Sequence, residues 1–148
     1  MRRGFTDGLV RGPAALHPFP SGTAMVRILI ADHNRNLGYV LGRELEDEGY
    51  TVDLAADGVE AVLRVLDGSD YDFVFIDAFT PRLDGLNALR IIKKINPDIR
   101  VVTFAAADLS GEMQSVLDAG ASACLAKPYE MEAIKTYLRS QIAERRDG

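Results

Sequence analysis

The sequence predicts an α/β protein built on an open, doubly wound sheet of five parallel strands with five helices. Five short apolar runs, typical of strands covered on both faces, alternate with longer segments in which apolar residues recur at helical spacing. Glycine or proline follows most of these longer segments, where a helix would end. With 148 residues, 47% of them hydrophobic, the chain can bury one substantial core and has no room for a second folded unit.

The two periodicities alternate along the chain from residue 27 onward. Apolar runs predict strands at 27–31, 50–55, 72–76, 99–105 and 121–126. The helical stripes are Leu37/Val40/Leu41/Leu45, Val59/Val62/Leu63/Leu66, Leu86/Leu89/Ile92/Ile95, Met113/Val116/Leu117 and Ile134/Tyr137/Leu138/Ile142. Because crossovers between parallel strands are right-handed, such helices come to lie on both faces of the sheet.

The two ends of the chain differ from this pattern. Residues 1–25 form a leader rich in glycine and proline, which we expect to be disordered because it buries too little apolar surface to offset its ordering entropy. Met25 is an alternative start of the chain. Residues 26–143 form the folded domain, and 144–148 form a short tail.

Composition excludes several classes of function. The net charge is −5, and lysine and arginine are dispersed, so no basic patch for nucleic acid is expected. The single cysteine excludes an internal disulfide framework and fits a reducing compartment. No apolar run approaches the ~18 to 20 residues that span a bilayer. We therefore expect a cytoplasmic protein whose partners are neither nucleic acid nor membrane.

Charged side chains stand at the carboxyl ends of the predicted strands. Asp32 and His33 follow the first strand, Asp77 the third and Lys127 the fifth. Ligands of a doubly wound sheet bind beyond these strand ends, so we expect the four side chains to line one crevice. A carboxylate beside a cation can attack phosphorus and form an acyl phosphate. The alternatives are a structural ion-pair cluster, or Asp77 as a helix cap, for which Asp84 is better placed.

Three motifs together resemble a known family. They are Asp32 with His33 after the first strand, "DAFTPRLDG" at 77–85 and "AGASACLAKP" at 119–128. In this order and spacing they are similar to the receiver domain of two-component response regulators, such as the chemotaxis response regulator. The resemblance covers residues 26 to about 143 and implies a flavodoxin-like (βα)5 fold.

The resemblance assigns roles to individual residues. It implies that Asp77 is the phosphoacceptor, that Asp32 belongs to an acidic pocket acting on Mg²⁺, and that Lys127 contacts the phosphoryl group. The backbone carbonyl of Phe79 would be a further Mg²⁺ ligand. The implied donor is a sensor histidine kinase or a histidine phosphotransfer protein, and the implied output is binding to a downstream protein target.

Three positions depart from the family pattern. Its second acid, usually a Mg²⁺ ligand, is His33 here; its Ser or Thr after the fourth strand is Ala105; and its switch aromatic is Cys124. Ala105 offers no hydroxyl, and losing such a charge-assisted hydrogen bond costs roughly 1.5 to 3 kcal/mol of coupling. Cys124 is expected to be a small buried apolar residue. Phe79 and Ala107 offer no polar group to orient water, so a phosphoaspartate should persist.

His33 changes both the charge and the ligand set of the predicted site. With a neutral imidazole, the two carboxylates and the lysine carry one net negative charge, where the family's three carboxylates and lysine carry two. Imidazole is a poor ligand for Mg²⁺, a hard cation that prefers oxygen, so we expect weakened Mg²⁺ binding. Three outcomes remain open for His33: a protonated side chain that partly replaces the metal charge, a side chain that points into water, or a preference for Mn²⁺ or Zn²⁺.

Two functions remain open at this point. The first is a single-domain response regulator that accepts a phosphoryl group on Asp77 in a phosphorelay. The alternative is a pseudo-receiver that binds its partner without phosphorylation, favoured by the three departures and opposed by the retained Asp77 and Lys127. Turnover of a small molecule is not expected. Hydrolases of the haloacid dehalogenase type need a second Asp where this chain has Phe79, and no glycine-rich phosphate loop follows the first strand.

Overall fold

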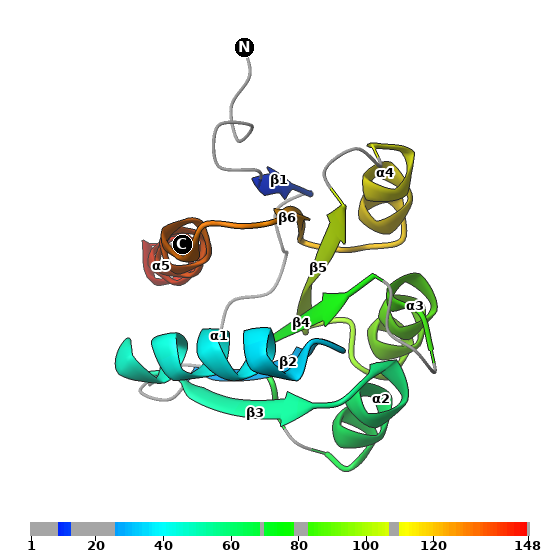
Figure 1. Cartoon of the computed structure of the whole chain (residues 1–148), viewed down its shortest axis with the longest axis horizontal. Helices are drawn as coiled ribbons and strands as arrows, with labels where there is room; N and C mark the ends of the chain where they lie inside the picture. Colours follow the sequence, from blue (N-terminus) through cyan, green and yellow to red (C-terminus); the bar gives the residue numbers. More distant parts are fainter. Residues whose placement is uncertain (1–8, 13–25, 69, 79–82, 107–109, 148) are drawn as a thin grey trace.

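The computed structural model describes residues 9–12, 26–68, 70–78, 83–106 and 110–147. Its centre is a six-stranded sheet with the order β1-β6-β5-β4-β2-β3 (Figure 1). The strands are β1 (Leu9–Arg11), β2 (Arg27–Ala31), β3 (Thr51–Ala55), β4 (Phe73–Asp77), β5 (Arg100–Ala106) and β6 (Ala123–Lys127). The helices are α1 (Arg35–Asp47), α2 (Gly58–Leu66), α3 (Gly85–Ile95), α4 (Ser110–Asp118) and α5 (Met131–Asp147).

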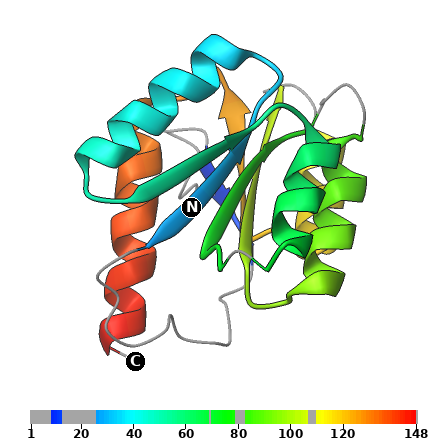
Figure 2. The ribbon, with the colours of Figure 1, turned by 90° about the horizontal axis from the view of Figure 1, so that it is seen from below.

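Helices cover both faces of the sheet. Figure 2 shows α1 and α5 on one face and α2, α3 and α4 on the other. Each layer has its own apolar core, the first containing Phe75 and Leu138 and the second containing Val74 and Leu89. All five residues of the inner strand β4 are buried, which explains why its sequence is apolar on both faces until the final aspartate.

Side-chain caps fix where three of the helices begin. Asn34, Asp57 and Asp84 each accept a hydrogen bond from a backbone N–H three residues later, at the starts of α1, α2 and α3. Asp84 accepts from the N–H of Asn87 at 2.8 Å. Asp84, and not Asp77, therefore caps α3.

The five parallel strands and the five helices confirm the predicted α/β fold class. β2, β3, β4, β5 and β6 form one parallel sheet in the doubly wound order, with helices on both faces. The observed ends of β2 match the prediction, and those of the other four parallel strands differ from it by at most two residues. Among the described residues, no helix is long and apolar enough to cross a membrane.

The sheet has a sixth strand, β1, that no pattern in the sequence predicts. Residues Leu9–Arg11 lie within the leader that was expected to be disordered, yet they form β1 and pair antiparallel with β6. The expectation of disorder is therefore wrong for residues 9–12, and the rest of the leader lies outside the described residues. Three residues are too few for a periodic pattern to show, and the pairing depends on an edge that only the folded domain supplies.

Candidate functional site

Three strand ends meet at one edge of the sheet and carry a polar cluster. Asp32 follows β2 directly, Asp77 is the last residue of β4, and Lys127 is the last residue of β6. The Nζ atom of Lys127 lies 3.0 Å from Oδ2 of Asp32 and 3.0 Å from Oδ2 of Asp77. Both carboxylates are buried, at 4% and 3% exposure, so the ammonium offsets two negative charges that have left bulk water.

His33 adds an imidazole to the cluster from its solvent side. Its Nδ1 atom lies 2.9 Å from Oδ2 of Asp77 and 3.9 Å from Oδ1 of Asp32, while the side chain is 49% exposed. An ionised carboxylate can only accept hydrogen bonds, so Nδ1 is the hydrogen-bond donor in this contact. One ring nitrogen of His33 therefore faces Asp77, while about half of the side chain is exposed to water.

Short-range contacts fix the Asp32 carboxylate and the backbone that follows Asp77. The backbone N–H of Asn34 donates to Oδ1 of Asp32 at 2.9 Å, and the Asn34 side chain caps α1. Beyond β4, the N–H of Gly85 donates to the carbonyl oxygen of Ala78 at 2.9 Å. A Cβ atom at Gly85 would lie 2.6 Å from Cα of Ala78 and 2.7 Å from the backbone oxygen of Asp77, so this approach requires glycine.

Two stacked aromatic rings lie next to the lysine. The Nζ atom of Lys127 lies 5.6 Å from the ring centroid of Phe104, and Phe104 stacks on Tyr129 with the centroids 5.0 Å apart. The Tyr129 hydroxyl is buried and has no hydrogen-bond partner among the described residues. Burial, and then the charges of Asp32 and Asp77, raise the pKa of this phenol. Sequence reasoning gave Tyr129 no place at the site, and its closeness to the Lys127-Pro128 motif is the signal that could have found it.

Three residues of the cluster could hold a metal ion. One ligand atom each from Asp32, His33 and Asp77 lies within 4.8 Å of the others. Two carboxylate oxygens suit Mg²⁺, whereas the imidazole nitrogen suits Mn²⁺ or Zn²⁺ better. Lys127 bonds to both carboxylates and so neutralises part of the charge that would attract a cation. The predicted carbonyl ligand at Phe79 lies outside the described residues.

Ala105 and Cys124 lie in the apolar core under α2, α3 and α4 rather than in the polar cluster. Asp77 pairs with Phe104, so Ala105 is the next residue along β5 and points to the opposite face of the sheet. Cys124 is fully buried on β6, as expected for a small apolar residue. The remaining predicted position, Ala107, lies outside the described residues.

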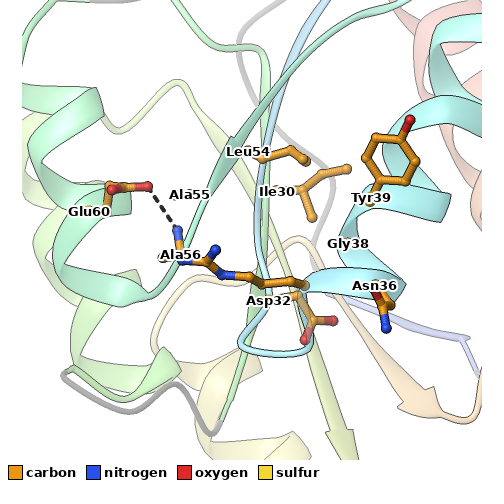
Figure 3. Close-up of a pocket in the computed structure, with 10 residues that line it drawn as sticks. Ile30, Asp32, Asn36, Gly38, Tyr39, Leu54, Ala55, Ala56 and Glu60 are labelled. Atoms are coloured by element: carbon orange, nitrogen blue, oxygen red, sulfur yellow. Dashed lines mark hydrogen bonds between the residues drawn. The ribbon is translucent and has the colours of Figure 1, made fainter.

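A pocket of about 400 Å³ opens beside the cluster, between α1, the end of β3 and the start of α2 (Figure 3). Asp32 lines it, and the labelled side chains of Ile30, Leu54 and Tyr39 form an apolar wall. Tyr39 is 55% exposed and Leu54 is 40% exposed. On the α2 side, the Glu60 carboxylate accepts a backbone N–H at 2.8 Å. The pocket therefore joins an apolar surface to the buried carboxylate.

Comparison with known proteins identifies the family. The chain matches the response regulator receiver domain family over residues 28–139, which is most of its length, and it belongs to that family. Receiver domains are signalling modules of two-component systems, and they typically bind Mg²⁺ in the active site. The receiver resemblance seen in the sequence motifs is thereby confirmed.

Individual relatives agree with this assignment. Response regulator MprA of Mycobacterium ulcerans is 38% identical over 117 residues, which cover 79% of this chain and 50% of that protein. The chain thus spans about half the length of the curated relatives it matches. The receiver domain of a sensor histidine kinase from Pseudomonas aeruginosa, solved with a magnesium ion in its active site cleft, is 30% identical with a TM-score of 0.72. That alignment covers 81% of this chain and 99% of the solved one.

A further solved relative is a complex of the chemotaxis proteins CheX and CheY with BeF3 and magnesium from Borrelia burgdorferi. Its similarity to this chain is 26% identity with a TM-score of 0.73, covering 78% of this chain and 87% of the solved chain. The folds therefore agree over nearly the whole domain.

Proposed function

We propose that Asp77 accepts a phosphoryl group from a phosphohistidine donor, as part of two-component signalling. The observation that carries this proposal is the ammonium of Lys127, 3.0 Å from the carboxylates of both Asp77 and Asp32 at the carboxyl ends of the strands. A cation so placed offsets negative charge beside a carboxylate that acts as a nucleophile toward phosphorus. The same cation is available to the phosphoryl oxygens after transfer.

The transfer uses few groups of the protein. A carboxylate oxygen of Asp77 forms a bond to phosphorus while the bond from phosphorus to the donor's imidazole nitrogen breaks, and the electron pair of the broken bond stays on that nitrogen. Lys127 offsets the charge on the phosphoryl oxygens, and Asp32 holds Lys127 in position at 3.0 Å. Ala105 has no hydroxyl and lies in the apolar core outside the cluster, so Lys127 is proposed as the main side-chain contact of the phosphoryl group.

Asp32 and Asp77 would hold Mg²⁺, with the carbonyl of Phe79 as a further proposed ligand. A bound ion would supply positive charge to the phosphoryl oxygens. His33 stands 2.9 Å from Asp77, where the family's second acid would supply an oxygen ligand. We therefore propose that this receiver binds Mg²⁺ more weakly than a receiver with three carboxylates.

The donor is proposed to be a sensor histidine kinase or a histidine phosphotransfer protein. Such a donor must bring an imidazole to the strand ends, and it needs a contact surface next to them. The pocket beside Asp32, with the exposed side chains of Tyr39 and Leu54, offers apolar contact area in that place. The phosphorylated module then signals by binding a downstream protein target.

Phosphorylation can be tested by intact mass. We expect acetyl phosphate or a phosphohistidine donor, with Mg²⁺, to add ~80 Da to the chain, the mass of one phosphoryl group. Asp77→Asn should abolish the adduct. Asp84→Asn is the matched control, because it changes a nearby carboxylate while asparagine still caps α3. That variant should be labelled like the unchanged chain.

Two results would count against the proposal. An adduct that survives in Asp77→Asn would place the modification elsewhere. The lack of any adduct with Mg²⁺, Mn²⁺ or Zn²⁺, in a chain shown by circular dichroism to be folded, would leave a module that binds its partner independently of phosphorylation.

A further inference from the structure

The outer edge of β6 is paired with the N-terminal strand of the same chain. β1 runs antiparallel to β6, and the N–H of Gly12 extends the pairing by donating to the carbonyl oxygen of Ser122 at 2.7 Å. Figure 1 shows β1 beside β6, between α4 and α5. Among the described strands, only β1 and β5 pair with β6. Without β1, the outer N–H and C=O groups of β6 would therefore be open to another extended segment.

The contacts of β1 show which side chains this edge accepts. Leu9 is 6% exposed and belongs to the apolar core that α5 covers. The guanidinium of Arg11 lies 5.5 Å from the ring centroid of Tyr137. It also donates to Oγ of Ser140 at 2.8 Å and lies 3.7 Å from the carboxylate of Glu144. The surface beside β6 thus takes an apolar side chain and, two positions later, an arginine.

The position after the arginine is limited to glycine. A Cβ atom at Gly12 would overlap the backbone oxygen of Ala121 and lie 3.4 Å from Cδ2 of Leu117. Val10, between the apolar residue and the arginine, is only partly buried. The edge therefore selects the pattern apolar, any residue, arginine, glycine, with backbone pairing supplying the rest of the contact.

β1 is short enough to be displaced. It has three residues, and only the side chain of Leu9 among them is buried. A strand of this size gains little apolar burial against the entropy of ordering its residues, so the docked and detached forms lie close in free energy. A second segment with the same pattern can then compete for the edge.

We propose that the outer edge of β6 is a strand-addition site for an extended peptide of the pattern apolar–any–Arg–Gly, and that β1 occupies this site in cis. The partner is a protein that presents such a segment in extended form. It pairs with β6 and places its arginine against Tyr137 and Ser140, and it must first displace β1. This assignment does not depend on phosphorylation of Asp77.

A disulfide tests whether β1 occupies the edge in cis. Val10 lies directly opposite Cys124, the single cysteine of the chain, and opposed residues point to the same face of a sheet. We expect mild oxidation of the full chain carrying Val10→Cys to form an intramolecular disulfide, seen as a monomer that loses two hydrogens. Arg11→Cys is the matched control, because its side chain points to the opposite face and should not reach Cys124.

Either of two results would overturn the cis assignment. One is an intermolecular disulfide as the main product of Val10→Cys, because the site would then hold the strand of a second copy. The other is an equal disulfide yield in Val10→Cys and Arg11→Cys, because β1 would then have no fixed register on β6.

A labelled peptide tests the strand-addition site itself. The probe is the sequence DGLVRGPA, residues 7–14 of this chain. Gly12→Val in the full chain should detach β1, because the added side chain overlaps the backbone oxygen of Ala121. We expect this variant to bind the probe about tenfold or more tighter than the unchanged chain, because in the unchanged chain the tethered β1 competes with the probe. The oxidised Val10→Cys chain should not bind. A probe carrying Arg11→Glu should lose about tenfold or more in affinity.

Val10→Pro gives a second way to open the edge. Hydrogen-bonded and non-hydrogen-bonded residue pairs alternate along an antiparallel ladder. Because the N–H of Gly12 bonds to Ser122, the next hydrogen-bonded pair is Val10 with Cys124. Proline at position 10 has no N–H and so removes a hydrogen bond from this pair. Circular dichroism identifies which variant remains folded. Equal probe binding to the unchanged, opened and disulfide-locked chains would overturn the proposal, as would no binding to a folded, opened chain.

Discussion

Among the single residues of the site, His33 is the one at which substitutions best test metal binding. Its Nδ1 atom lies 2.9 Å from Asp77, where a carboxylate would add an oxygen ligand and a negative charge. We expect His33→Asp to tighten Mg²⁺ binding by about tenfold, measured by isothermal titration calorimetry. His33→Asn, which supplies an oxygen without charge, separates the ligand effect from the charge effect. Unchanged Mg²⁺ affinity in His33→Asp would show that this position does not act on the metal.

Tyr129 is a residue whose hydroxyl the fold does not use for its own stability. The hydroxyl is buried without a hydrogen-bond partner among the described residues, while the ring stacks on Phe104. Tyr129→Phe keeps the stack and removes the buried polar group. We expect the free energy of unfolding, measured with urea, to stay the same or rise by up to about 1 kcal/mol.

Tyr129→Ala is the comparison for that measurement. It removes the ring as well, and we expect it to lower the free energy of unfolding by about 2 kcal/mol or more. A loss of more than about 1 kcal/mol in Tyr129→Phe would instead show that the hydroxyl is hydrogen-bonded in solution.

At the scale of helices and strands, the sequence predicted those elements whose residues repeat a pattern many times. β4 shows four consecutive apolar residues, and the stripe of Leu86, Leu89 and Ile92 gives α3 an unmistakable helical period. β1 has three residues and no repeat, and its pairing depends on contacts of Arg11 with α5 that no local pattern encodes. Tertiary contact, rather than propensity, makes this strand.

The turn from β4 into α3 depends on one glycine. A Cβ atom at Gly85 would lie 2.6 Å from Cα of Ala78 and 2.7 Å from the backbone oxygen of Asp77. We expect Gly85→Ala to lower the free energy of unfolding by about 1 to 3 kcal/mol, because α3 must move away from the strand end. The phosphoryl adduct on Asp77 should form more slowly in the same variant. Urea unfolding and intact mass measure the two effects.

Gly111 in α4 provides the control for this substitution. Apart from its chain neighbours and the backbone of its own helix, no atom of the described residues lies within 4 Å of a Cβ at this position, so Gly111→Ala should be neutral or stabilise the fold by up to about 1 kcal/mol. If both alanine variants behaved alike, the close approach at Gly85 would not matter for stability.

At the scale of the whole molecule, the sequence predicted where the site would form and could not predict its inner contacts. Strand order and crossover handedness are enough to bring Asp32, Asp77 and Lys127 to one edge of the sheet. The direction of the His33 ring depends on side-chain rotamers and on hydrogen bonds between segments 44 residues apart. The stack of Tyr129 on Phe104 likewise joins β5 to the segment between β6 and α5 through tertiary packing alone.

The stability of the whole domain should fall at alkaline pH because of a buried phenol between α5 and the sheet. Tyr137 packs edge-on against Phe73 at 6.3 Å between centroids, and burial raises its pKa from 10.0 to about 12. Between these two values the unfolded chain has lost the proton and the folded chain retains it. This contribution to stability is therefore complete below pH 10.0 and is lost as the pH rises toward about 12.

Tyr137→Phe removes this titration, so the free energy of unfolding should decline less steeply over the same range. Urea unfolding of both chains from pH 9 to pH 12 measures the difference, about 2 to 3 kcal/mol at the upper end. Lys93, whose pKa burial lowers, changes stability in the opposite direction in both chains and cancels in the comparison. Parallel curves for the two chains would show that the Tyr137 phenol ionises as easily in the fold as in the unfolded chain.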